Sequence, residues 1–434
     1  MMIKLKEAFR SFLMKNIQQS GVISSATMPD PCSTPLYTGW KVTDPTTGAV
    51  TCLRVLVPFK ELICGIVGMD KYLARKMPNK YVWFTFLVDQ SARDYEEAIP
   101  QWDSKFIPSP EHINLLIDVL MQPNIPGYGR AYYGWGEAGA GKTSTALWLC
   151  AILRLAVIHV NCRPNMEVEE FFLSQIAVDG KWQQISGPVM EAVLRDWVLI
   201  VDELDLAPDE FWPALNNLIE GRSVAIPGYP GKRIQARSTF KIIGFGNTGP
   251  TGDELATYCG RSQIDASVLD RMFKDYYEPC TRKMFMEIIL KHFDNAITDD
   301  LADRLGEFAV MVNLAVKNGD FPEMLSPRGM ISLCNLFLRN EKIMRFPLLY
   351  AIGAIFGSVL CNRENRETLF NAYSMAICEN AININDIKKN WADRFKVLKE
   401  EKNSSSSSEE LVSESADNAD NENTPTDDKS QDVA

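Results

Sequence analysis

The middle of the chain alternates short, continuously apolar stretches with longer stretches whose apolar residues recur every three or four positions. In the longer stretches, such as 113–121 and 208–220, this spacing places apolar side chains along one face of a helix. Continuously apolar strands are expected where helices cover both faces of a parallel sheet. The pattern therefore predicts an α/β fold. Its predicted strands are 130–135, 156–161, 197–201, 240–245 and 273–277.

The pattern changes on both sides of this region. Two predicted strands, 53–57 and 81–88, precede it, whereas beyond Pro279 the spacing is helical as far as about Val397. Two short apolar runs around a Pro- and Gly-rich turn at 227–231 predict a β-hairpin. We therefore expect four segments: an N-terminal α/β accessory region at 1–105, an α/β domain at 106–280, a helical lid at 281–400, and a disordered acidic tail at 401–434.

Charge is concentrated near the C-terminus. The net charge is −11, and nine of the 56 acidic residues but only one of the 45 basic residues lie after residue 402. This tail, which includes five consecutive serines, cannot bury enough apolar surface to fold, so we expect a solubilising end, with an adaptor-binding peptide as the alternative. The remainder is nearly neutral and gives no overall electrostatic signal for nucleic-acid binding, although it leaves room for a local basic face.

The sequence contains no apolar run of the roughly 20 residues that a membrane-spanning helix needs. The first 19 residues have an amphipathic pattern interrupted by Glu7, unlike an export signal. The ten cysteines are scattered without a Cys-x-x-Cys pair, so we expect no zinc site and place Cys150 and Cys334 in a reduced core. These features favour a cytoplasmic protein without membrane contact.

A complete G-x-x-x-x-G-K-[ST] pattern lies between the predicted strand 130–135 and a predicted helix at 143–153. Glycines let such a loop turn its N–H groups toward phosphate oxygens, Lys142 can reach the β- and γ-phosphates, and the Thr143 hydroxyl suits Mg²⁺. We therefore predict a site for ATP and Mg²⁺. The loop residues assigned to it are Gly136, Glu137, Ala138, Gly139, Ala140, Gly141, Lys142, Thr143 and Ser144.

Two carboxylates, Asp202 and Glu203, follow the predicted strand 197–201. Ligands of open α/β sheets bind at the carboxyl ends of the strands. Asp202 is predicted to share the Mg²⁺ ion with Thr143. Glu203 is expected on the opposite side of an extended chain, where it would polarise the water that attacks the γ-phosphate.

Two more polar residues complete the candidate set. Asn247 follows the strand 240–245 and is placed to hydrogen-bond the attacking water or the γ-phosphate. Arg328 lies in the first turn of a predicted helix, where a cation opposes the helix dipole at a cost of about 0.3 to 1 kcal/mol. We therefore expect Arg328 to bind an anion.

These motifs, in this order, resemble the AAA+ ATPases, and within them the MoxR-like, dynein-related branch that includes the AAA+ subunit of cobaltochelatase. The resemblance covers about residues 106–339 and implies a five-stranded parallel sheet followed by a helical lid. It implies Asn247 as the first sensor, Arg328 as the second, and Arg271 as an arginine finger that reaches the nucleotide of the next subunit in a ring, expected to be a hexamer. The hairpin around 227–231 resembles the insertion that this branch carries.

The chain departs from the family pattern at Glu137-Ala138, where family members usually have two prolines. The sequence also contains nothing resembling a von Willebrand factor type A domain, although family members commonly work with a partner that carries one. The resemblance therefore implies a separate partner, either such a protein or a protein client.

The resemblance implies an ATP-hydrolysing ring ATPase that remodels or activates a partner protein. Its implied catalytic residues are Lys142, Glu203, Asn247, Arg271 and Arg328. Two alternatives remain open: the ATPase subunit of a cobalt- or magnesium-chelatase-like complex, and a nucleic-acid-acting NTPase of a phage or mobile element. A motor of this kind does not by itself specify its substrate. A module that binds nucleotide without hydrolysis is disfavoured because Glu203 and Arg271 would then have no role.

Overall fold

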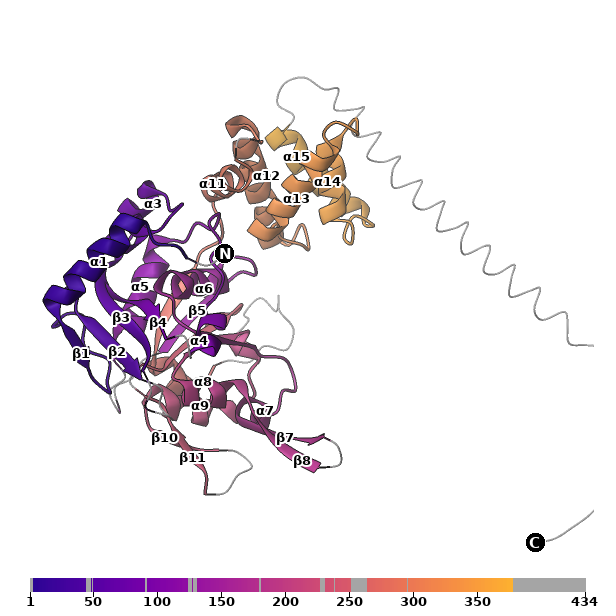
Figure 1. Cartoon of the computed structure of the whole chain (residues 1–434). Helices are drawn as coiled ribbons and strands as arrows, with labels where there is room; N and C mark the ends of the chain where they lie inside the picture. Colours follow the sequence, from indigo (N-terminus) through magenta and orange to yellow (C-terminus); the bar gives the residue numbers. More distant parts are fainter. Residues whose placement is uncertain are drawn as a thin grey trace, which may run out of the picture. The chain divides into compact units, whose positions relative to one another are not determined.

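The computed structural model (Figure 1) describes most of the chain up to residue 377, and the predicted tail at 401–434 lies outside this part. The described residues form two compact units, one reaching Asp294 and including Ser326–Arg328, the other formed by residues 296–325 and 329–377. The described ranges are 3–43, 48, 50–89, 92–123, 127, 131–178, 181–226, 231–237, 239–250, 264–294 and 296–377.

A five-stranded, fully parallel sheet forms the centre of the first unit, as the sequence predicts. The strand order is β13-β5-β12-β9-β6, so neighbours in the sheet are distant in the sequence. The carboxyl ends of β5, β12 and β9 consequently lie side by side. The strands are β5 (Ala131–Gly136), β6 (Val157–Asn161), β9 (Val198–Asp202), β12 (Lys241–Gly246) and β13 (Met272–Tyr277).

Each face of the sheet is buried under helices. Along β9, Val198 and Ile200 join the core beneath α5 (Pro110–Met121) and α6 (Lys142–Leu153), whereas Leu199 and Val201 join the opposite core. Successive side chains of a strand point to opposite faces, so both faces need apolar residues. This explains why β9 is continuously apolar up to Asp202. The opposite core is covered by α7 (Val168–Phe172), α8 (Pro188–Arg195) and α9 (Phe211–Ile219).

The N-terminal region has a sheet of its own, in the order β1-β2-β3-β4. The strands predicted at 53–57 and 81–88 are part of it. Its strands are β1 (Val22–Ser24), β2 (Gly39–Thr43), β3 (Val50–Pro58) and β4 (Tyr81–Val88), and its helices are α1 (Glu7–Ser20), α2 (Phe59–Gly65), α3 (Lys71–Lys76) and α4 (Arg93–Glu97).

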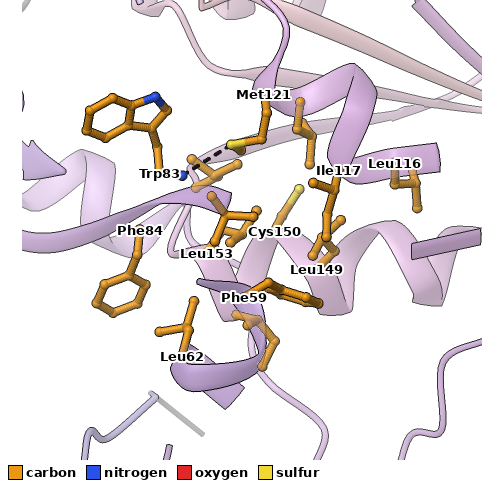
Figure 2. Close-up of a cluster of buried hydrophobic side chains, with 14 of the residues drawn as sticks. Phe59, Leu62, Trp83, Phe84, Leu116, Ile117, Met121, Leu149, Cys150 and Leu153 are labelled. Atoms are coloured by element: carbon orange, nitrogen blue, oxygen red, sulfur yellow. Dashed lines mark hydrogen bonds between the residues drawn. The ribbon is translucent and has the colours of Figure 1, made fainter. Parts of the chain in front are cut away.

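This N-terminal sheet shares one hydrophobic core with α5 and α6 (Figure 2). Phe59 and Trp83 from the N-terminal region pack in the same cluster as Ile117 of α5 and Leu153 of α6. The backbone N–H of Trp83 also donates to Met121 Sδ at 3.2 Å. Residues 1–105 are therefore joined to the helical layer of the central sheet by buried apolar surface, not only by the connecting chain.

Two β-hairpins extend the first unit. The hairpin predicted around 227–231 is present as the antiparallel pair β10 (Ser223–Ala225) and β11 (Arg233–Gln235). A second antiparallel pair, β7 (Leu173–Val178) and β8 (Lys181–Ser186), was not predicted. The sequence Asp179-Gly180 between these two segments is a common hairpin signal that could have identified the pair.

The described part of the second unit is helical, as predicted for the lid. Thr298 caps α12 (Asp299–Lys317) by accepting a hydrogen bond from Leu301 N, and the buried Asn313 side chain bonds both the N–H and the carbonyl of Leu325. The other helices are α13 (Pro327–Asn340), whose first residues belong to the first unit, α14 (Pro347–Ile355) and α15 (Arg363–Ile377); α11 (Arg282–Phe293) belongs to the first unit. No helix among the described residues is long and apolar enough to cross a membrane.

Candidate functional site

The phosphate-loop pattern forms the turn between β5 and α6. Gly141 adopts a left-handed conformation (φ 84°) immediately before the first residue of α6, and Gly136 has φ 151°. A β-carbon at Gly136 would collide with the carbonyl oxygen of Tyr277. Glycine is therefore required here by both backbone conformation and space. The turn places the loop at the positive end of the α6 dipole, where anions are stabilised.

Lys142 connects the loop to the neighbouring strand. Its Nζ donates to the carbonyl oxygens of Gly136 at 2.7 Å and Glu137 at 2.9 Å, and to Asn247 Oδ1 at 2.8 Å. The lysine is 7% exposed, so its charge is held among oxygen acceptors away from bulk water. The structure thus brings Lys142 and Asn247 together. Glu137 meets the lysine through its backbone carbonyl.

Thr143 and Asp202 also meet, as the sequence predicts. Thr143 Oγ1 donates to Asp202 Oδ2 at 2.7 Å, and His159 Nε2 lies 3.5 Å from the same oxygen. Burial opposes ionisation of Asp202, but hydrogen bonds from His159 and Thr143 and the nearby charge of Lys142 outweigh it, so its pKa is lowered. A carboxylate that remains ionised at neutral pH beside a hydroxyl is a suitable oxygen pair for Mg²⁺. His159 is a contributor that the sequence analysis missed.

The prediction that the chain is extended at Glu203 is wrong. Its backbone is left-handed (φ 54°, ψ 39°) and begins a short 3₁₀ turn, η1 (Leu204–Leu206), so the chain is no longer extended after Asp202. The side chain nevertheless reaches the site, because Asn247 Nδ2 lies 3.1 Å from Glu203 Oε1 and 3.2 Å from Oε2. Lys142, Asn247 and Glu203 therefore form one hydrogen-bonded chain.

Asp205 fixes the backbone that carries Asn247. Its Oδ2 accepts from Asn247 N and Thr248 N, each at 3.1 Å, and from Thr248 Oγ1 at 2.8 Å. The side chain is almost fully buried, at 1% exposure. The sequence analysis missed this role, although an acidic residue between two leucines just after Glu203 is a signal for a buried, hydrogen-bonded carboxylate.

The candidate arginines, Arg271 and Arg328, have different surroundings. Arg271 follows α10 (Ala266–Asp270), where its Nε donates to Glu220 Oε1 at 2.6 Å and its Nη1 to the carbonyl of Ser267 at 2.5 Å. Arg328 lies in the first turn of α13, within the three residues that cluster with the first unit. The neighbouring Ser326 approaches Gly139 of the loop closely enough to leave no room for a β-carbon there.

The pKa of Cys280 depends in part on the position of Glu137. Burial, followed by the negative charge of Glu137, raises the pKa of the Cys280 thiol to about 11. Burial and then Glu137 also raise the pKa of Tyr276 on β13. The carboxylate that replaces the expected proline is therefore close to the end of β13.

Comparison with known proteins agrees with this geometry. Residues 135–272 match the family model described as the AAA domain, dynein-related subfamily. This stretch runs from the end of β5 to the start of β13 and contains Lys142, Glu203 and Asn247. This stretch of the chain is thus similar to AAA domains of the dynein-related subfamily.

The chain is also similar to uncharacterised proteins of Staphylococcus aureus. One from strain NCTC 8325 is 23% identical over 247 residues, which cover 55% of this chain and 88% of that protein. One from strain USA300 is 23% identical over 246 residues with the same coverage. Among solved structures, a candidate ATPase from Cytophaga hutchinsonii has 12% identity and a TM-score of 0.34, covering 67% of this chain and 94% of that one.

Proposed function

We propose that this chain is the subunit of an ATP-hydrolysing ring that remodels or activates a partner protein. The observation that supports hydrolysis most directly is the chain of hydrogen bonds from Lys142 through Asn247 to Glu203, with lengths of 2.8 and 3.1 Å. The three residues follow three adjacent parallel strands. A lysine, an amide and a carboxylate gathered at the carboxyl edge of such a sheet suit phosphoryl transfer to water.

Each residue has a distinct task in this proposal. Lys142 exchanges its carbonyl and amide partners for the β- and γ-phosphate oxygens of ATP when the nucleotide binds. Glu203 accepts a proton from the attacking water. Asn247, held at its backbone by Asp205, fixes the orientation of the Glu203 carboxylate through Nδ2. Positioning of this kind supplies much of the rate enhancement in phosphoryl transfer.

The residues present fit a magnesium ion. Thr143 and Asp202 offer two hard oxygen ligands 2.7 Å apart, and the lowered pKa of Asp202 keeps its carboxylate available at neutral pH. Mg²⁺, when bound with the nucleotide, neutralises charge that develops on the phosphate oxygens. His159 would keep Asp202 oriented during this exchange of partners.

The proposal includes a ring, with six subunits as the resemblance to the AAA+ ATPases implies. Within the described residues the Arg271 side chain binds Glu220 and Ser267 of its own chain. In the proposed ring Arg271 stabilises charge on the γ-phosphate held by the next subunit. Arg328 acts as the second sensor. Its helix begins beside Gly139, which supports a role near the phosphates.

The decisive experiment compares wild-type protein with Glu203→Gln. The variant is expected to bind ATP and assemble normally but to lose hydrolysis, because glutamine retains the shape and the bond to Asn247 without a basic carboxylate. Hydrolysis at the wild-type rate would overturn the proposed mechanism.

The partner is proposed to be a protein, as in MoxR-like systems. The Glu203→Gln protein, held in ATP, should retain that partner and release it in ADP, which mass spectrometry of both fractions would measure. Retention of nucleic acid that nuclease treatment removes, with no protein bound, would contradict a protein partner.

A further inference from the structure

Glu220 lies between two arginines at the end of α9. Its Oε1 accepts from Arg271 Nε at 2.6 Å, and its Oε2 lies 2.9 Å from Arg222 Nε. The Glu220 side chain is 10% exposed, whereas that of Arg222 is 60% exposed. Charge-assisted hydrogen bonds of this length are among the strongest in proteins, and one carboxylate here serves both guanidinium groups.

These contacts leave one edge of the Arg271 guanidinium available. Nε is bound to Glu220 and Nη1 to the Ser267 carbonyl at 2.5 Å. Within the part of the chain that the structure describes, Nη2 has no hydrogen-bond partner. The side chain is 26% exposed. The Arg271 guanidinium is thus held through Nε and Nη1, and its Nη2 can donate hydrogen bonds to a ligand.

We propose that Glu220 is a positioning residue, which holds Arg271 so that Nη2 meets the triphosphate of the neighbouring subunit. This inference rests on the proposed ring function and adds the residue that prepares its trans-acting arginine. A free arginine side chain occupies many rotamers, and ordering it at the moment of contact costs entropy. Glu220 and Ser267 impose that order before the subunits meet.

The same carboxylate connects Arg271 to the β10–β11 hairpin. Arg222 immediately precedes β10, and Arg233 on β11 clasps Ser223 through Nε at 2.9 Å and Nη2 at 3.0 Å. Displacement of the hairpin would therefore move Glu220 through its ion pair with Arg222. A contact made at the hairpin would in this way change the position of the arginine that acts on the next subunit.

The test measures steady-state ATP hydrolysis by the full chain. Glu220→Ala is expected to lower kcat by roughly 10- to 100-fold, because misplacing a transition-state contact by about 1 Å has effects of this size. KM for ATP should stay within about twofold, since Lys142 and Thr143 of the binding subunit are untouched. Glu220→Gln, which retains one acceptor oxygen, should recover part of the activity.

A double variant separates positioning from a general structural role. If Glu220 acts through Arg271, the protein carrying Glu220→Ala and Arg271→Ala should be no slower than Arg271→Ala alone. A further loss in the double variant would overturn the inference. An unchanged kcat in both Glu220→Ala and Glu220→Gln would also overturn it. A raised kcat would overturn it as well, because Glu220 would then inhibit Arg271 instead of positioning it.

Two hairpin variants test the connection. Arg222→Ala should lower kcat by a smaller factor than Glu220→Ala, whereas Arg233→Ala, which removes a charge from the same hairpin without touching Glu220, should not lower it. Equal losses in both would contradict the link through Glu220. If Arg271→Ala itself leaves kcat unchanged, the proposed trans mechanism fails; if only the Glu220 variants are without effect, the mechanism stands and the positioning role fails.

Discussion

The side-chain amide of Asn247 is bonded to both oxygens of Glu203, with Nδ2 3.1 Å from Oε1 and 3.2 Å from Oε2. Asn247→Ala removes this contact and the acceptor for Lys142, so it is expected to lower kcat about 100-fold with little change in nucleotide affinity. Asn247→Asp should be at least as damaging, because a second carboxylate would repel Glu203. Hydrolysis assays and fluorescent-nucleotide titrations would measure both; an alanine variant with normal turnover would contradict the assignment.

The Thr143–Asp202 pair predicts a selective dependence on Mg²⁺. Thr143→Val preserves the shape of the side chain but removes the hydroxyl, so half-maximal hydrolysis should require about tenfold more Mg²⁺. Asp202→Asn should raise the requirement further because a neutral amide is a poorer ligand. A magnesium titration at saturating ATP measures the effect, with the melting temperature of each nucleotide-free variant as the control for folding. Unchanged magnesium dependence in both variants would exclude the pair from the metal site.

The proposed action of Arg271 across a subunit boundary predicts complementation. Arg271→Ala and Lys142→Ala proteins should each hydrolyse ATP far more slowly than the wild type, with a low but measurable rate left in Arg271→Ala. The first lacks the trans charge, and the second does not hold the nucleotide. A mixture should recover activity, since some intact nucleotide sites would then face an intact arginine. Mixing either variant with buffer-treated copies of itself is the control. A mixture as slow as its components would count against a shared site.

The core between the N-terminal sheet and α6 predicts a large stability effect at Leu153. This residue is completely buried. Leu153→Ala should reduce the free energy of unfolding by about 2–5 kcal/mol. Leu194→Ala on α8 is a matched control because Leu194 is 44% exposed, and its effect should stay within about 0.5 kcal/mol. Urea unfolding followed by circular dichroism would measure both, and equal effects would contradict the packing.

Burial also predicts which thiols react. It raises the pKa of Cys150 from 9.0 to about 12, so Cys150 should resist iodoacetamide at pH 8 in the native protein, whereas the exposed Cys64 should be alkylated. Peptide mass spectrometry measures both, with urea-unfolded protein as the fully labelled control. The unfolded thiol ionises first, so the stability linked to Cys150 is complete below pH 9 and is lost between pH 9 and about 12. Rapid native labelling of Cys150 would contradict its placement.

Sequence periodicity predicted the sheet because its central strands, such as β9 and β12, are buried on both faces and are therefore almost continuously apolar. The sequence also predicted that Asp202 would lie near Thr143. Asp202 ends one strand and Thr143 follows the loop after another, and the carboxyl ends of parallel strands lie at the same edge of the sheet. The sequence did not reveal the left-handed backbone of Glu203 or the support from Asp205. Both depend on how the chain turns after β9 against β12, and strand periodicity carries no information about that turn.

The contacts of Glu220 and His159 were missed for a related reason. Glu220 is at the end of an amphipathic helix, where a carboxylate is ordinary, and only the folded chain places Arg271 beside it, 51 positions away. His159 lies within a strand, and its proximity to Asp202 results from the pairing of β6 with β9. Such contacts join side chains that are distant in the sequence, so they can be predicted only when the order of the strands in the sheet is known.

The apolar cluster that joins Phe59 and Trp83 to Leu153 has a mechanical meaning. The helix that begins at the phosphate loop shares this buried apolar surface with the N-terminal sheet, so a shift of α6 relative to that sheet would expose apolar side chains to water. A partner that binds the N-terminal region would therefore be coupled to the phosphate loop through α6. Removing the N-terminal region would expose the apolar side chains of α6 that pack against β4.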